Sequence, residues 1–429
     1  MTGKSTGKTI FITGASNGIG KYLAELAQAA GHTVLTTGRS AGELRKDLIE
    51  EDAPQVLAEF AKSADIAVLN AAIAPGVGVE TEFKVNLTRQ MQLALLLLKQ
   101  NPKIKLAFVG SVISGAIIPT YPAYCAAKAG LAAFARALAA EFPGQVLLYH
   151  PSGTESKFME RTGVTNPGHL DSTEAVAGRL LTLISKTRYP WRRPATWKAW
   201  AIDWAAKLAV VKGPKVPAFQ GGSTLITGAA SGLGQALKAH CPEAIGLDLA
   251  DSDVSADLSR PLPDLPTAER LINCAGITWT GPTPDMPYDQ VERLVQVNLL
   301  APIALEEALE PQQVVQISSL SHQVGYPFAA VYAATKSALA IWGQCQGHLV
   351  IYPGPMDTPQ ATAARLGGEP SKAIADPSKV AKQILAVSLK GQRQLVPGLA
   401  NKTLRVAGRL LPNITTAAFA KDQRKRLSS

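Results

Sequence analysis

The chain has 429 residues, 46% of them hydrophobic and 18% charged, which is enough for two or three domains with buried cores. This composition excludes a disordered tail, and 36 Gly and 29 Pro without a fixed period exclude collagen. The net charge is +10, no apolar run is long enough to span a membrane, and the N-terminus leads directly into a predicted strand. The four cysteines show no metal-ligand spacing, so we expect a cytoplasmic protein with reduced thiols and no metal.

Apolar, strand-like runs alternate with helical stretches in two successive sets. The first set covers residues 9–13, 33–37, 66–70, 106–110 and 145–150. The second covers residues 223–227, 244–248, 270–273, 313–318 and 348–352. Continuous apolar strands separated by helices are typical of parallel sheets covered on both faces. The sequence therefore predicts two doubly wound, Rossmann-type α/β modules in tandem.

The two sets are copies of one module. The segment 13–20 recurs at 227–234 with an offset of 214, and the offset falls to 202 between Pro151 and Pro353. The second copy is therefore trimmed, in the short stretch 248–273 and most clearly in the helix before Pro353, from which we expect more than a turn to be lost. We predict an N-terminal module at 1–185, a basic linker at 186–220, a trimmed module at 221–398 and a basic extension at 399–429.

A glycine-rich turn follows the first strand of each module and opens a helix. In this position, backbone N–H groups and a helix N-terminus face the pyrophosphate of a dinucleotide. The candidate cofactor-binding residues of these turns are Gly14, Ser16, Asn17, Gly18, Ile19 and Gly20 in the first copy and Gly228, Ser231, Gly232, Leu233 and Gly234 in the second.

A Tyr and a Lys four residues apart, on one face of a predicted helix, occur in each copy: Tyr124 with Lys128, and Tyr332 with Lys336. Ser111 and Ser319 each precede the tyrosine by 13 residues, at the end of a strand. With the Thr-Gly-x-x-x-Gly-x-Gly turns, these motifs resemble the short-chain dehydrogenase/reductase family, twice over, across residues 8–160 and 222–360. The resemblance implies hydride transfer between NAD or NADP and a carbonyl or hydroxyl group.

The resemblance also assigns roles to residues. It implies that the two tyrosines are general acid/base groups, that the lysines lower their pKa and bind the nicotinamide ribose, and that the serines hydrogen-bond the substrate oxygen. It implies that Asn86 and Asn298 complete each site by holding a water that relays protons. Further cofactor contacts are implied for Asn70, Ala71, Pro151 and Ser156 in the first copy and for Asn273, Ala275, Gly276, Pro353, Gly354 and Thr358 in the second.

Cofactor choice is read at the end of the second strand, where a basic residue accommodates a 2′-phosphate and a carboxylate binds the ribose hydroxyls. Arg39 occupies this place in the first copy and predicts NADP(H). Asp248 occupies it in the second and predicts NAD(H). Asp257 and Leu258 resemble the family's adenine-contacting pair.

The positive charge is concentrated in two stretches, 186–215 with a net +7 and 401–429 with a net +6. Trp197, Trp200 and Trp204 lie on an apolar helical stripe in the first stretch, and Leu399, Val406 and Leu410 lie opposite Lys402, Arg405 and Arg409 in the second. One interpretation is that the stripes pack on the modules while the cations are solvated or bind an anionic substrate. The other is peripheral contact with an anionic membrane. Nucleic acid is not expected, because no base-reading motif accompanies the charge.

These patterns favour a bifunctional NAD(P)-dependent oxidoreductase acting on a small, anionic molecule such as a sugar nucleotide, a carrier thioester or a lipid-like substrate. One alternative is an epimerase that oxidises with NAD in one module and reduces with NADPH in the other. Another is a single ketoreductase whose other half is structural or senses cofactor. We also expect an intrachain pseudo-dimer, with residues 81–100 and 123–141 facing 288–309 and 331–345.

Overall fold

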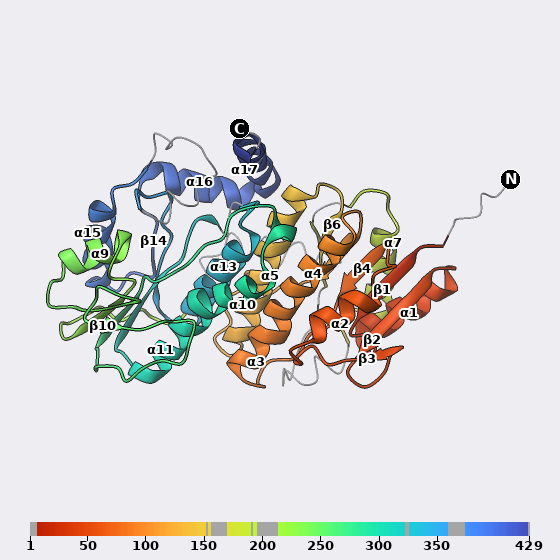
Figure 1. The fold of residues 1–429 in the computed structure, drawn as a ribbon, viewed down its shortest axis with the longest axis horizontal. Coiled ribbons are helices and arrows are strands. Elements are labelled where there is room, and N and C mark those ends of the chain that lie inside the picture. The colour runs from red at the N-terminus through yellow and green to blue at the C-terminus, as the bar shows by residue number, and fades with distance from the viewer. Residues whose placement is uncertain are drawn as a thin grey trace. The chain divides into compact units, whose positions relative to one another are not determined.

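The computed structural model describes residues 7–151, 153–155, 170–189, 192–194, 213–321, 326–358 and 374–427. The chain divides into two compact units. The first comprises Met1–Ala116 and Ala123–Val210, and the second comprises Ile117–Pro122 and Val211–Ser429. Figure 1 labels their elements.

The first unit is a parallel sheet with helices on both faces. Its strands are β1 (Thr9–Thr13), β2 (Thr33–Gly38), β3 (Leu44–Arg45), β4 (Ile66–Leu69), β5 (Lys105–Val109), β6 (Val146–His150) and β7 (Arg192–Pro194). Its helices are α1 (Gly18–Ala29), α2 (Ala53–Phe60), α3 (Val79–Phe83), the π-helical turn η1 (Lys84–Thr88), α4 (Arg89–Gln100), α5 (Pro122–Glu141) and α7 (Thr173–Ile184). The strand order β3-β2-β1-β4-β5-β6-β7 is that of a doubly wound fold.

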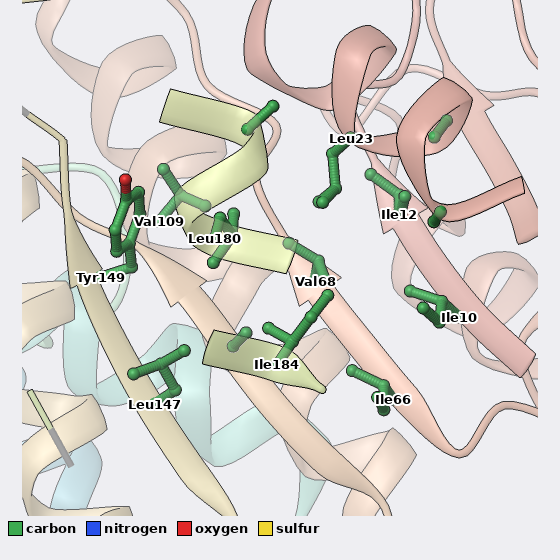
Figure 2. Close-up of a cluster of buried hydrophobic side chains, with 14 of the residues drawn as sticks. Ile10, Ile12, Leu23, Ile66, Val68, Val109, Leu147, Tyr149, Leu180 and Ile184 are labelled. Carbon is green, nitrogen blue, oxygen red and sulfur yellow. The ribbon is translucent and has the colours of Figure 1, made fainter. Parts of the chain in front are cut away.

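The core of the first unit lies on both faces of this sheet. On one face, apolar side chains of β1, β4, β5 and β6 pack against α1 and α7 (Figure 2). On the other face, Phe11 contacts Phe60 of α2 with ring centroids 6.2 Å apart, and Phe108 contacts Phe134 of α5 at 5.9 Å. Because both faces are covered, neighbouring residues of one strand are all buried, which explains the continuous apolar runs in the sequence.

The second unit repeats this architecture. Its strands are β8 (Thr224–Thr227), β9 (Ile245–Asp248), β10 (Val254–Ser255), β11 (Arg270–Asn273), β12 (Gln313–Ile317), β13 (Leu349–Ile351) and β14 (Gln394–Leu395), in the order β10-β9-β8-β11-β12-β13-β14. Its helices are α9 (Gly232–Ala239), the 3₁₀ turn η2 (Thr283–Asp285), α10 (Tyr288–Val295), the π-helical turn η3 (Gln296–Leu300), α11 (Ala301–Leu309), α13 (Ala330–Gln346), α15 (Pro377–Ser388), α16 (Leu399–Leu410) and α17 (Pro412–Leu427).

The predicted fold class, two tandem parallel α/β modules, is confirmed. Each of the ten predicted strands is present with ends within two residues of those expected, whereas the short strands β3, β7, β10 and β14 were not predicted. Trimming is also found, because residues 256–269 contain no helix where the first unit has α2. The expected loss of more than a turn from the helix after Tyr332 is too large, since α13 ends 14 residues after Tyr332 and α5 ends 17 after Tyr124.

The C-terminal helix α16 does not bury its apolar stripe. Leu399 is 80% exposed and Val406 is 54% exposed, although seven residues place them on one helical face. The opposite face packs on the second unit instead, where Leu404 contacts the core and Arg405 lies 4.3 Å from the ring centroid of Tyr352. The expectation that this stripe packs on the module is therefore wrong. The tryptophan stripe of the basic linker lies outside the described residues.

Candidate active sites

The glycine turns lie where each first strand passes into a helix, and their backbone requires glycine. Gly14 and Gly18 have φ of +70° and +59°, and Gly228 and Gly232 have +72° and +53°. A Cβ atom on Gly14 would lie 2.8 Å from the Cα of Ala71, and one on Gly228 would lie 2.8 Å from Ala275. Each turn therefore packs tightly on the loop after β4 in the first unit or after β11 in the second. This leaves the N-terminus of α1 or α9 to face a ligand.

A threonine at the end of each first strand ties the turn to this loop. The hydroxyl oxygen of Thr13 accepts hydrogen bonds from the backbone N–H groups of Asn70 at 2.9 Å and Ala71 at 3.0 Å. Thr227 accepts the same pair from Cys274 and Ala275, both at 3.0 Å. Neither threonine was predicted as a site residue, although both belong to the repeated Thr-Gly motif.

The two units differ in the position of an asparagine at the end of β4 or β11. The side-chain amide of Asn70 donates to the carbonyl oxygens of Thr13 at 3.0 Å and Gly14 at 3.2 Å, and so supports the glycine turn. The amide of Asn273, one position earlier in the motif, donates to Gln316 Oε1 at 3.1 Å. Successive residues of a strand point to opposite faces, which explains why the two asparagines have different partners.

The predicted selectivity residues lie at the ends of β2 and β9. Arg39 follows β2 directly and is exposed. Asp248 is the last residue of β9, and its Oδ2 accepts a hydrogen bond from the backbone N–H of Ala230, within the glycine turn, at 2.9 Å. Asp257 binds Ser259, whose hydroxyl lies 2.7 Å from Oδ1, and this bond holds the pKa of Asp257 below its usual range. Leu258 is buried in the core.

Each Tyr and Lys pair lies on one long helix, where Tyr124 and both lysines are buried and Tyr332 is partly exposed. Lys128 of α5 donates to the carbonyl oxygen of Val109 at 3.2 Å, and its Nζ lies 5.8 Å from the ring centroid of Tyr124. Lys336 of α13 donates to the carbonyl oxygen of Ile317 at 3.0 Å. Both lysines are thus fixed to the last residue of the central strand β5 or β12.

The serines complete both groups. The Ser111 side chain hydrogen-bonds Tyr124, and that of Ser319 hydrogen-bonds Tyr332. Each serine hydroxyl also accepts a backbone N–H two residues further on, from Ile113 at 3.3 Å in one case and from Ser321 at 3.1 Å in the other. The structure therefore brings Ser, Tyr and Lys together at the carboxyl end of the central strand in both units.

Asn86 and Asn298 lie in the π-helical turns η1 and η3, which the sequence analysis did not predict. The Asn86 side chain binds both backbone groups of Ile73, through Oδ1 at 2.9 Å and Nδ2 at 3.1 Å. Asn298 binds Ile277 in the same way, at 2.8 and 2.9 Å. Asn86 thus fixes the loop after β4, and Asn298 fixes the loop after β11. Short π-helical turns are frequent at functional sites.

Burial controls the protonation of the central residues. It lowers the pKa of Lys128 and of Lys336 to about 8, because the charged ammonium is desolvated. It raises the pKa of Tyr332 to about 12 and also raises that of Tyr124, while the serine hydrogen bonds oppose this effect. The expected lowering of the tyrosine pKa by lysine does not appear among the protein's own groups, because the desolvation of each phenol dominates.

A buried carboxyl group in the first unit was also missed. Glu82 of α3 is 4% exposed, and its Oε1 accepts the backbone N–H of Gly76 at 2.8 Å. Burial raises the pKa of Glu82, and its charge in turn raises the pKa of Tyr124. No sequence signal marks Glu82, because an acidic residue in a first helical turn is normally an exposed one.

The segment after β13 approaches the glycine turn of the second unit. Thr358 lies against Gly232, where an added Cβ would meet the Thr358 methyl carbon at 3.1 Å. The carbonyl oxygen of Pro353 accepts the N–H of Leu320 at 3.1 Å. Gly354 faces Asn401 of α16, since an added Cβ would lie 2.6 Å from Asn401 Cγ. Pro151 follows β6 directly, and Ser156 lies outside the described residues.

These features define a class of protein, an α/β protein with two dinucleotide cradles, each beside a Ser, Tyr and Lys group. The glycine turn of the first unit leaves room for a pyrophosphate at Gly18, where an added Cβ would meet no atom within 4 Å. Among the described residues, no three or more His, Cys, Asp or Glu side chains gather as metal ligands. No helix of the described parts is both long and apolar enough to cross a bilayer.

Comparison with known proteins gives the family. The profile described as short chain dehydrogenase matches residues 47–164 and 243–362, which together exceed half of the chain. The chain therefore belongs to the short-chain dehydrogenase family and contains two copies of it in tandem.

Individual relatives match only parts of their sequences. "Dehydrogenase/reductase SDR family member 7B" of Mus musculus is 31% identical over 148 residues, covering 33% of this chain and 44% of the relative. Its counterpart in Danio rerio is 26% identical over 215 residues, covering 44% of this chain and 70% of the relative. The chain spans less than half the length of the first curated relatives that it matches.

One solved structure matches nearly the whole chain. It is an N-terminal ketoreductase from the macrolactin assembly line, with a TM-score of 0.59 and 13% identity, covering 91% of this chain and 87% of the other. At this identity the likeness shows the fold alone.

Proposed function

We propose that both units bind a nicotinamide dinucleotide and that the chain interconverts carbonyl and hydroxyl groups. The observation that carries this proposal is the meeting of Ser, Tyr and Lys at the carboxyl end of the central strand in each unit. The dinucleotide would supply or accept the hydride at the carbon atom of the substrate.

The protein's own groups would handle the proton. During reduction, the hydroxyl of Tyr124 or Tyr332 donates its proton to the oxygen that becomes the alcohol, and the adjacent serine hydroxyl donates a hydrogen bond to that oxygen. Because burial raises the pKa of both phenols, each is protonated at neutral pH and ready to donate. In the oxidative direction the same groups act in reverse. Lys128 and Lys336 have pKa values of about 8, so an increasing share of each is neutral as the pH rises. The neutral amine can then accept a proton.

The two units would differ in cofactor. Arg39 is exposed at the end of β2, where its guanidinium can bind a 2′-phosphate, and this favours NADP(H) in the first unit. Asp248 accepts a hydrogen bond from the backbone N–H of Ala230 and so lies beside the glycine turn. There its charge would repel a 2′-phosphate, which favours NAD(H) in the second unit. Asn86 and Asn298 would hold the loop beside each substrate, and the lysines would bind the ribose.

Within this proposal, two active sites form one bifunctional oxidoreductase, and the basic segments attract an anionic substrate. Coupled oxidation and reduction, giving net epimerisation, and one active ketoreductase with a structural partner are the alternatives. We further propose the four-part division at residues 185, 220 and 398 and an intrachain pseudo-dimer. Both follow from the tandem repeat and the shared family fold.

The test is a binding titration of NADPH, NADP, NADH and NAD to the full chain, with Arg39→Ala and Asp248→Ala as variants. We expect the first change to weaken the phosphorylated pair only, by about tenfold or more, because it removes a charge-assisted hydrogen bond. We expect the second to weaken only NAD and NADH. Matched Tyr124→Phe and Tyr332→Phe variants should keep binding but each lose turnover at one site. Binding of one cofactor class at a single site would contradict the bifunctional proposal.

The exposed face of α16 supports a second function, docking at an anionic membrane surface. Leu399 and Val406 are exposed, as are Leu411, between α16 and α17, and Ile414 of α17, at 53% and 64%. Lys402 is exposed as well and lies three residues after Leu399 and four before Val406, so it borders the apolar stripe and does not lie opposite it as expected. The net +6 of residues 401–429 complements anionic lipid headgroups.

Vesicle pelleting tests this docking. We expect the full chain to pellet with phosphatidylcholine vesicles that contain phosphatidylglycerol, and less at high salt, because salt screens the attraction. The double variant Leu399→Ser/Val406→Ser should stay in the supernatant. Leu389→Ser is the control, because Leu389 is 58% exposed but follows α15. Equal pelleting of both variants, or none by the unaltered chain, would overturn the proposal.

A further inference from the structure

A chain of hydrogen bonds crosses the buried interior of the second unit. Asn273, at the end of β11, donates to Gln316 of β12 at 3.1 Å, and Gln316 Nε2 lies 3.4 Å from Nδ1 of His348. The other ring nitrogen of His348 lies 2.9 Å from Oε1 of Glu306 in α11, and Trp342 of α13 donates to the second carboxylate oxygen at 3.1 Å. Asn273, Gln316 and His348 are 2%, 0% and 7% exposed.

The first unit shows that the fold does not need this chain. The register pairs Asn273 with Gln316 across β11 and β12, and it pairs Leu69 with Phe108 across β4 and β5. In the first unit, the positions of Asn273, Gln316, His348, Glu306 and Trp342 are occupied by Leu69, Phe108, Val146, Ala94 and Phe134, all of them buried. Buried polar groups are costly relative to apolar ones of similar size, so their presence in one copy only calls for a role beyond packing.

The direction of the hydrogen bonds follows from their chemistry. Gln316 Oε1 accepts from Asn273, so its Nε2 donates to His348, and Nδ1 of the imidazole is therefore the acceptor. The hydrogen of the neutral ring is then on Nε2, which donates to Glu306. The Oδ1 atom of Asn273 is buried and has no partner among the described residues.

Asn273 begins the segment that forms one side of the candidate site. The next two residues, Cys274 and Ala275, donate their N–H groups to Thr227, and Ala275 lies against Gly228 of the glycine turn. Gly276 follows, where an added Cβ would lie 3.2 Å from both Asn298 Oδ1 and Lys336 Nζ. Residues 274–276 thus separate the glycine turn from the side chains of Lys336 and Asn298. The orientation of Asn273 affects where this segment lies.

We propose that Gln316 and His348 are positioning residues of the second active site, which hold Asn273 and, through it, residues 274–276 beneath the dinucleotide. This proposal rests on the proposed cofactor binding by the second unit. Loss of either side chain would leave the Asn273 amide without a fixed partner on β12.

The imidazole of His348 is held from both sides. Gln316 of β12 donates to its Nδ1, and its Nε2 donates to Glu306 of α11. Cofactor affinity of the second unit should therefore depend on the imidazole and on Gln316.

The experiment compares NADH and NADPH affinities of the full chain with those of Gln316→Leu, His348→Val and His348→Gln. We expect the first two to weaken NADH binding about three- to tenfold, the loss of one hydrogen bond, and to leave NADPH binding unchanged. His348→Gln keeps a donor and an acceptor at this position, so it should preserve most of the affinity. It also serves as the second variant if the apolar change impairs folding.

Amide hydrogen exchange of residues 274–276 without added dinucleotide gives a readout that is independent of turnover and of cofactor. It should accelerate in Gln316→Leu and His348→Val. Thermal stability should fall somewhat in both, because each single change leaves buried polar partners unpaired. Unchanged NADH affinity and unchanged exchange in stable variants would overturn the positioning role. A chain that binds no NADH but shows the faster exchange would refute cofactor binding and leave the positioning role supported.

Discussion

Lys128 and Lys336 carry a charge into the interior of each unit, where only 2% and 4% of the residue is exposed. Burial lowers the pKa of each from an ordinary value of about 10.4 to about 8. Between these two values the folded protein binds fewer protons than the unfolded chain, so stability rises with pH in that window. Below pH 8 the full cost of the buried charge is present.

We therefore predict that Lys336→Met stabilises the chain at pH 7 while it abolishes turnover at the second site. The relieved desolvation amounts to at most about 3 kcal/mol, reduced by about 1 kcal/mol for the lost hydrogen bond to Ile317. The difference from the unaltered chain should shrink as the pH rises from about 8 to about 10.4. Denaturant unfolding at several pH values measures it, with exposed Lys402→Met as control. A difference that does not vary with pH would refute the buried charge.

At this scale the sequence identified most of the residues that the structure brings together, because the motifs combine rare residue types with fixed spacing. Ser111, Tyr124 and Lys128 are adjacent in space for the reason the spacing suggests, a strand end facing a helix. It did not identify Glu82 or the network around His348. The environment of these residues depends on which side chains of different elements come into contact. A single Glu or His without a motif gives no sign of such contacts in the sequence.

At the scale of elements, strands were predictable because burial on both faces leaves a continuous apolar run. The very short edge strands were not, since β3 and β10 contain only two residues each. The π-helical turns η1 and η3 were also missed, because one extra residue per turn shifts a helical pattern too little to be read. Both units nevertheless place their asparagine in such a turn, so the irregularity is a property of the module.

Helix α16 shows where amphipathic patterning gives the wrong inward face. The face opposite its apolar stripe contains Leu404, which is partly buried, and Gly408, which is buried. Arg405 packs its guanidinium over the ring of Tyr352. A long cationic side chain stacked on an aromatic ring can contribute as much to packing as an aliphatic one. The apolar stripe is then left exposed, which the sequence could not indicate because both faces offer contacts.

At the scale of the whole molecule, duplication has left two sheets of the same strand order with different interiors. The first unit has Phe108 against Phe134, where the second has Gln316 and Trp342 within a polar network. The conserved parts are the glycine turns, their threonines and the Ser, Tyr and Lys groups. The divergent parts are the loops and helices after each strand, where function varies on a common scaffold. Two sites of unequal specificity are the expected result.

This leads to a prediction for the thermal unfolding of the full chain. With the proposed pseudo-dimer, we expect one cooperative transition that NADPH and NADH each raise. At a hundredfold excess over Kd, each ligand adds about 2.7 kcal/mol, or roughly 3 °C for a cooperative unit of this length at about 2.1 cal/mol/K per residue. Because the two proposed sites are distinct, the shifts should add, and Arg39→Ala should remove only that of NADPH. Differential scanning calorimetry measures both effects. Two transitions, each raised by one ligand, would contradict the pseudo-dimer, and shifts that do not add would mean that both ligands compete for one site.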